Sequence, residues 1–69
     1  MIIKFSRHAE EQMINRGISI TEVEEAIKQG SKYLQNPDKV IAEYKYFSVV
    51  YKKFGEIHYV ITVKPRWRI

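Results

Sequence analysis

The sequence has 69 residues, with 12 Lys and Arg against 8 Asp and Glu, a formal net charge of +4, two histidines and no cysteine. A chain of this length forms one domain and buries only about 60% of its unfolded surface. The absence of cysteine excludes disulfides and thiolate metal sites, and two histidines are too few for a structural zinc site. The apolar start, MIIKFSRH, is too short for a signal peptide or a membrane span, so we expect a soluble cytoplasmic protein without membrane contacts.

Two short helices are predicted in the first half of the chain. Ser6 is a cap residue and Gly17 a left-handed stop, which together delimit a first helix. Ser19 and Glu22 have the spacing of a capping box, and Gly30 closes the second helix. The two helices are joined by so few residues that they must turn sharply against each other.

After the second helix the residues favour strands. SKYLQ is a candidate short strand, NPDK is a turn, and the following stretch is rich in β-branched and aromatic residues. Gly55 divides this stretch into a hairpin of residues 47–53 with 57–64, while residues 40–46 either form a separate strand or continue into residue 47. The expected fold class is α+β, and residues 1–69 form a single domain: two N-terminal helices pack on a three- or four-stranded antiparallel sheet.

Alternation along the last strand predicts which residues face the helices. One set of residues is expected on the helix side and the other on the opposite face or rim. The first set is Ile57, Tyr59, Ile61 and Val63, and the second is His58, Val60, Thr62 and Lys64.

The charge is uneven along the chain. Residues 1–30 hold four basic and five acidic residues, a net charge of −1, whereas residues 31–69 hold eight and three, a net charge of +5. The second part also contains all five tyrosines, the tryptophan and two of the three phenylalanines. Cations for phosphates and flat rings for bases favour a nucleic-acid surface, although aromatic strands also build cores.

Two residues of the first helix are candidates for chemistry. His8 lies in the first turn, where the helix dipole favours a neutral imidazole that serves as a general base; the alternative is a surface histidine bonded to a backbone group. Arg16 lies in the apolar arc at the helix end, where its guanidinium either clamps a phosphate or lays its stem along apolar surface. Roughly 12 Å along the axis separates the two, so they reach one extended ligand rather than each other.

The end of the chain, VKPRWRI, is basic. Lys64, with Thr62 beside it, is a candidate phosphate ligand, and the alternative is a closing segment with a core tryptophan and solvated charges. No P-loop, dinucleotide, zinc-protease or EF-hand motif occurs, so any chemistry is metal-free and cofactor-free acid–base work, such as RNA cleavage by its own 2′-hydroxyl. The candidate RNA-binding residues are Lys45, Lys52, Lys53, Arg66, Trp67 and Arg68.

The stretch SRHAEEQMINRGISITEVEEAIKQG resembles the start of a family of small bacterial and archaeal domains of unknown function, and VVYKKFGEIHYVITVKP resembles its closing hairpin. That family is similar to the BrnT-type and RelE/ParE-like toxins of toxin–antitoxin modules. The resemblance implies a RelE-like fold and a toxin that cleaves RNA without a metal or cofactor to arrest translation, with His8, Arg16, Thr62 and Lys64 as catalytic residues. Its implied partners are RNA, including ribosome-bound mRNA, and an antitoxin encoded nearby, and a homodimer is compatible with it.

One feature departs from the RelE-like pattern: the chain has no tyrosine after its last strand. Two other functions therefore stay open beside the endoribonuclease. The first is a non-enzymatic basic module that binds RNA or an acidic protein segment. The second is an accessory protein in which His8 and Arg16 bond only to local backbone.

Overall fold

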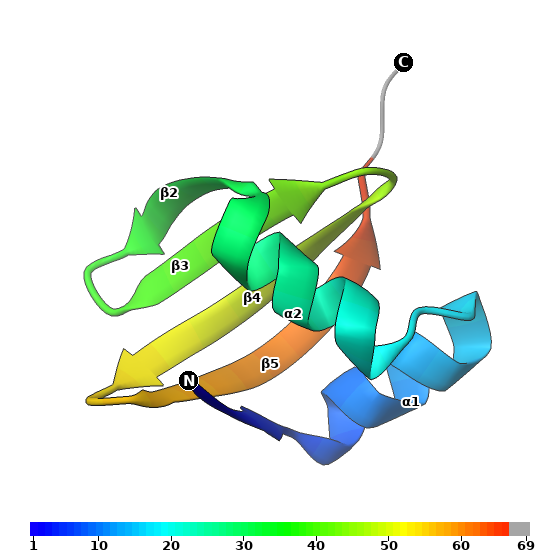
Figure 1. Cartoon of the computed structure of the whole chain (residues 1–69), viewed down its shortest axis with the longest axis horizontal. Coiled ribbons are helices and arrows are strands. Elements are labelled where there is room, and N and C mark those ends of the chain that lie inside the picture. The colour runs from blue at the N-terminus through cyan, green and yellow to red at the C-terminus, as the bar shows by residue number, and fades with distance from the viewer. Residues whose placement is uncertain (67–69) are drawn as a thin grey trace.

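The structure, a computed structural model, describes residues 1–66. Its elements in chain order are β1 (Ile2–Phe5), α1 (Arg7–Arg16), α2 (Ile20–Gln29), β2 (Ser31–Asn36), β3 (Lys39–Tyr44), β4 (Phe47–Phe54) and β5 (Ile57–Pro65) (Figure 1). The strands form one five-stranded sheet in the order β1-β5-β4-β3-β2, in which β1 runs parallel to β5 and the other neighbours are antiparallel. The prediction of a three- or four-stranded antiparallel sheet is therefore wrong: the sheet is larger and mixed, and a strand precedes the helices.

The strand that the sequence analysis missed is β1. Its four residues are too few to show a clear alternation, and its partner is at the far end of the chain, where Ile2 pairs with Ile57 and Phe5 with Val60. Because parallel neighbours need a long crossover connection, α1, α2 and three strands lie between the two halves of this pair. The first and last strands thus lie side by side (Figure 1).

Both predicted helices are present, with the predicted caps. The Ser6 side chain accepts a hydrogen bond from the backbone N–H of Ala9, and Gly17 ends α1 in the left-handed conformation at φ 68°. At the start of α2, Ser19 and Glu22 form the reciprocal capping box. These features are local in sequence, which explains why they were predictable.

Of residues 40–46, which were expected either to form a separate strand or to continue into residue 47, those up to Tyr44 belong to the separate strand β3, and residues 45 and 46 form the turn before β4. The chain leaves β3 through a tight turn in which Lys45 adopts a positive φ of 53°. Glycine and asparagine are the usual residues at such positions, so a lysine here does not indicate a turn. The hairpin of β4 with β5 matches the prediction, and Gly55 lies in its turn at φ 59°.

A bulge changes which residues of β5 face the helices. Val50 pairs with Thr62 and Tyr51 with Val60, so β5 has one extra residue, Ile61, at this point. Val60 and Val63 are both in the core, three positions apart. The predicted faces are therefore wrong before the bulge and correct for Val63 after it.

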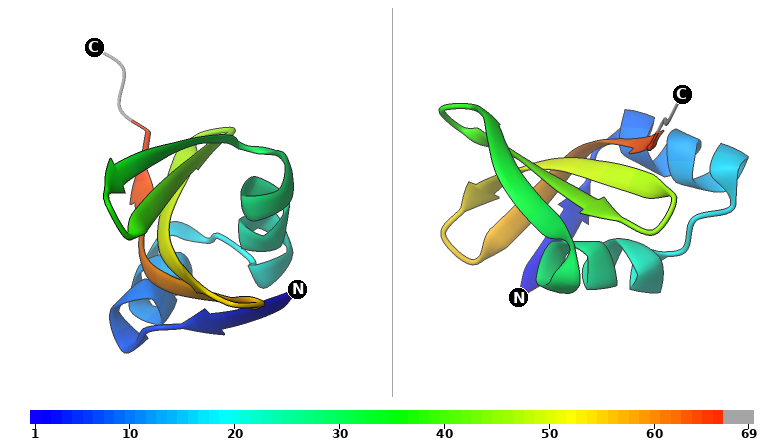
Figure 2. Two further views of the ribbon diagram at one scale, coloured as in Figure 1. Left: turned by 90° about the vertical axis from the view of Figure 1, so that its left-hand side faces the viewer. Right: turned by 90° about the horizontal axis from the view of Figure 1, so that it is seen from above.

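The core lies between α2 and the sheet, which curls around that helix, while α1 lies along the edge of β5 beyond the end of β1 (Figure 2). Fully buried side chains from the central strands and α2 fill this space. They include Val23, Phe47, Val49, Val60 and Val63. Ala9 and Met13 of α1 join the same cluster.

Candidate nucleic-acid interface

The sheet has a face that turns away from α2, which we call the outer face. On β4, Phe47, Val49 and Tyr51 belong to the core, so the alternate residues of that strand point the opposite way. Cross-strand pairing extends this assignment, because directly paired residues share a face; Tyr59, for example, pairs with Lys52. The outer-face residues used below are Lys4, Tyr33, Lys39, Glu43, Lys52, Phe54, Ile57, Tyr59, Ile61 and Lys64.

Four lysines lie on the outer face, one each from β1, β3, β4 and β5. Lys52 Nζ is 3.3 Å from Asp38 Oδ2 in the neighbouring turn. Within residues 1–66, the only other ion pair joins Arg66 to Glu43, with Nη2 and Oε1 3.6 Å apart. The other three lysines of the face, Lys4, Lys39 and Lys64, form no ion pair with a described carboxylate, so their charges are available to an anionic ligand.

Aromatic and aliphatic side chains line a hollow among these lysines. The hollow has a volume of about 550 Å³, and its lining residues are Lys39, Lys52, Phe54, Ile57, Tyr59 and Ile61. Phe54 and Tyr59 are 57% and 37% exposed, which leaves ring surface open to solvent beside the cations. Flat rings beside cations are what a single-stranded nucleic acid needs for stacking and phosphate contacts.

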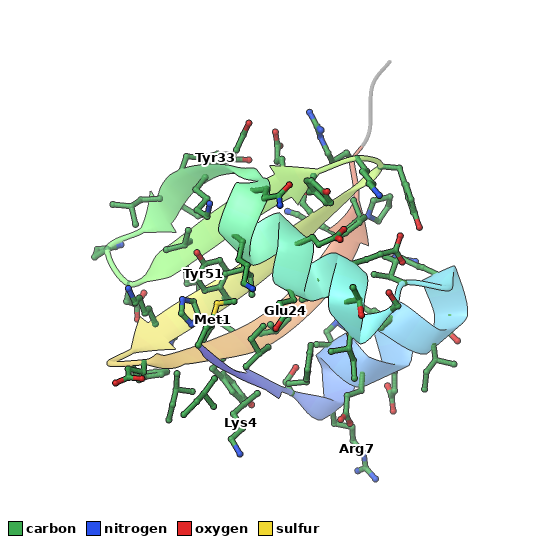
Figure 3. The ribbon with its side chains drawn as sticks, viewed as in Figure 1. Met1, Lys4, Arg7, Glu24, Tyr33 and Tyr51 are labelled. Atoms are coloured by element: carbon green, nitrogen blue, oxygen red, sulfur yellow. The ribbon has the colours of Figure 1, made fainter. Side chains whose placement is uncertain are left out.

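Tyr33 and Glu43 extend the outer face towards β2. The Tyr33 hydroxyl donates a hydrogen bond to Glu43 Oε2 at 3.2 Å. Desolvation, followed by the hydrogen bond and charge of Glu43, raises the pKa of the Tyr33 phenol. Figure 3 shows Lys4 and Tyr33 projecting from the two opposite edge strands, whereas Tyr51 lies between α2 and the sheet.

Thr62, a predicted catalytic residue, is part of a structural contact. Its hydroxyl donates to Gln12 Oε1 at 2.5 Å, and the same oxygen accepts the backbone N–H of Val63 at 2.8 Å. Ser6 makes a related contact, donating from Oγ to the carbonyl of Ile61 at 2.8 Å. Ser6 and Gln12 thus satisfy the edge of β5 beyond the point where β1 ends.

His8 and Arg16 lie at opposite ends of α1, and both are exposed. Arg16 borders a hollow of about 310 Å³, together with Ile18, Tyr46, Phe47 and Pro65, which brings it near the end of β5. His8 is not among the residues that line this hollow, the hollow of the outer face, or a third hollow between α1 and α2. The structure thus brings Arg16 close to the end of β5, whereas His8 lies at the other end of α1.

The other predicted RNA-binding residues are dispersed. Lys52 lies on the outer face; Arg66 donates to the carbonyl of Lys45, which itself lies in the exposed turn before β4. Lys53 follows Tyr51 in the alternation and points to the helix side. Trp67 and Arg68 lie outside the described residues.

Several residues of this surface were not predicted. Lys4 was missed because β1 was not recognised, and Tyr59 because the bulge shifted the faces of β5. Lys39 and Phe54 were not predicted either.

On the helix side, His58 packs against Tyr51, with ring centroids 5.4 Å apart. The Nδ1 atom of His58 is buried and has no hydrogen-bond partner among the described residues. Burial raises the pKa of the Tyr51 phenol.

Within residues 1–66 no group of three or more His, Cys, Asp or Glu side chains is arranged to hold a metal ion. Neither described helix has the length and apolar character that crossing a membrane requires.

A family model described as a domain of unknown function, DUF4258, matches residues 5–66. The chain belongs to this family. No curated protein and no solved structure gives a significant match. Family membership therefore agrees with the predicted small domain of unknown function and assigns no activity.

Proposed function

We propose that this DUF4258 domain binds single-stranded RNA on the outer face of its sheet. The observation that carries the proposal is the combination, on the face opposite α2, of exposed aromatic rings with three lysines that form no ion pair with a described carboxylate. The lysines contact phosphates and release counterions, while Tyr59 and Phe54 stack on bases. Neither contact requires a particular base sequence, so the expected recognition is general.

The placement of the predicted catalytic residues supports binding rather than cleavage. An acid–base mechanism needs its groups within hydrogen-bond reach of one reacting phosphate. His8 and Arg16 are separated by two turns of α1, and the Thr62 hydroxyl already donates to Gln12. RNA cleavage, which similarity to BrnT-type and RelE/ParE-like toxins would imply, is therefore the second outcome that the experiment must detect.

Binding is tested by fluorescence anisotropy with a labelled single-stranded RNA of about 12 nucleotides at several salt concentrations. We expect Lys4→Gln and Lys64→Gln each to weaken binding and to reduce the slope of log affinity against log salt by about 1. Lys28→Gln, on the exposed side of α2, is the matched control and leaves both quantities unchanged. Equal losses in all three variants would show that the outer face is not the binding site.

Stacking is tested separately at Tyr59. Tyr59→Ala is expected to cost about 1–3 kcal/mol of binding free energy, because a stacked base loses its platform, and Tyr59→Phe retains most of the affinity. The same RNA is run on a denaturing gel after incubation with the parent protein and with His8→Ala. Cleavage by the parent that His8→Ala abolishes would replace the binding proposal with the endoribonuclease.

A further inference from the structure

A second surface lies on the helix side, where α1 meets α2. Ile14 and Ile20 are 80% and 63% exposed, and both border a hollow of about 490 Å³. The remaining lining residues are Phe5, Glu10, Met13, Ile18 and Ser19. Met13 and Ile18 are buried, so the hollow has an apolar floor and two exposed isoleucines at its rim. We call it the elbow groove.

Three acidic side chains lie in or beside the elbow groove. Glu10 is the one charged residue among those that line it. Glu11 lies three positions before Ile14 and Glu24 four positions after Ile20, so helical spacing places both carboxylates beside the exposed isoleucines. None of these three glutamates forms an ion pair with a described residue.

This charge pattern argues against a second copy of the chain as occupant. Two elbow grooves brought face to face would oppose their carboxylates, and like charges that are brought together lower affinity. A segment that combines apolar side chains with basic ones would pair with Glu10, Glu11 and Glu24 while covering Ile14 and Ile20. The groove therefore has the electrostatic character of a site for a basic partner.

The backbone around the groove limits the form of that partner. Apart from Phe5 of β1, the groove is built by α1, α2 and their connection, whose backbone groups are committed to the helices and caps. An added strand needs a run of free sheet edge, and only Phe5, the last residue of the edge strand β1, borders the groove, whereas a helix needs only an apolar groove. Exposed apolar side chains at helical spacing are typical of a groove that binds a helix.

We propose that the elbow groove binds a basic amphipathic helix from a partner protein. The apolar stripe of that helix covers Ile14 and Ile20, and its lysines or arginines lie against Glu10, Glu11 and Glu24. The elbow groove is lined by residues of β1, α1, α2 and their connection, whereas the hollow of the outer face is lined by residues of β3, β4 and β5, so this partner and RNA occupy separate surfaces.

The probe is a synthetic helical peptide of about 14 residues, with leucines along one stripe and lysines elsewhere, titrated by calorimetry into the full chain. A second peptide replaces every lysine with glutamate. We expect the lysine peptide to bind at least about tenfold more tightly than the glutamate peptide, and the double variant Ile14→Ala/Ile20→Ala to weaken it about tenfold or more. Glu10→Gln and Glu24→Gln should each lower the affinity for the lysine peptide and should not lower the affinity for the glutamate peptide.

Leu34→Ala is the matched control, because Leu34 is a 68% exposed aliphatic residue on β2, at the edge of the sheet. It should leave peptide binding unchanged. Peptide binding that is insensitive to Ile14 and Ile20, or equal for the two peptides, would overturn the proposal. So would sedimentation showing a dimer that Ile14→Ala/Ile20→Ala dissociates, since the occupant would then be a second copy. RNA affinity of the double variant should equal that of the parent, so this test and the RNA test fail independently.

Discussion

Gln12 connects α1 to the edge of β5 where no neighbouring strand is present. Its side-chain oxygen accepts both the Val63 amide and the Thr62 hydroxyl, which places two hydrogen bonds on one atom. A backbone N–H at the end of a truncated ladder is costly when it is left without an acceptor in a partly buried position. The amide in α1 is therefore explained by the shortness of β1.

Gln12→Ala is expected to reduce the free energy of unfolding by about 1–3 kcal/mol, because both donors lose their acceptor while α1 itself remains a good helix. Gln12→Glu replaces the amide oxygen with a carboxylate oxygen that can accept the same two hydrogen bonds, and should recover most of the loss. Asn15→Ala, an exposed amide on the same helix, should change stability by no more than about 0.5 kcal/mol. Urea unfolding measures all three, and a Gln12→Ala midpoint equal to that of the parent would contradict this role.

At the scale of single elements, the sequence was informative where structure is set by neighbouring residues. Ser6, Gly17 and the Ser19–Glu22 box are decided within a few positions, and each is observed as predicted. β1 and the bulge in β5 depend on pairing between distant segments, which a single sequence does not display. The same holds for the candidate site. Its basic residues could be chosen from the composition, but the face of the sheet on which each one lies depends on the strand register.

Gly30 shows how a correct prediction can have a different physical reason. Gly30 was predicted as a helix stop, yet its φ of −70° and ψ of 166° are angles that any residue can adopt. A Cβ at this position would lie 2.5 Å from the Ala26 carbonyl oxygen and 2.7 Å from that of Glu43. The missing side chain lets the end of α2 approach β3 closely.

Gly30→Ala is therefore expected to destabilise the protein by about 1–3 kcal/mol through overlap with backbone atoms that cannot rotate away. In the absence of that overlap, the same substitution in this conformation would stabilise by about 0.4–1 kcal/mol, through the entropy of the unfolded chain. The direction in which Gly30→Ala shifts the midpoint temperature of thermal unfolding therefore distinguishes overlap from its absence. A stabilised Gly30→Ala variant would show that α2 and β3 are not so closely packed.

At the scale of the whole molecule, β1 joins the start of the chain to its last strand. The pairing of Ile2–Phe5 with β5 gives the sheet its fifth strand and puts α1 beside the remaining edge of β5. It also divides the molecule into two surfaces. Lys4 lies with the cations of the outer face, whereas Phe5 lines the elbow groove and packs against the core.

Ile2 and Ile3 test this arrangement with identical chemistry at adjacent positions. Ile3 is partly buried against the core, whereas Ile2 is 47% exposed and alternates to the outer face. Ile3→Ala is expected to cost about 1–3 kcal/mol, the lower part of the range for buried aliphatic truncations, and Ile2→Ala about 0.5 kcal/mol or less. Chemical denaturation of the two variants under one set of conditions gives the comparison. Equal and small effects would mean that residues 2–5 do not pair with β5, and both surfaces would then lose the strand that orders them.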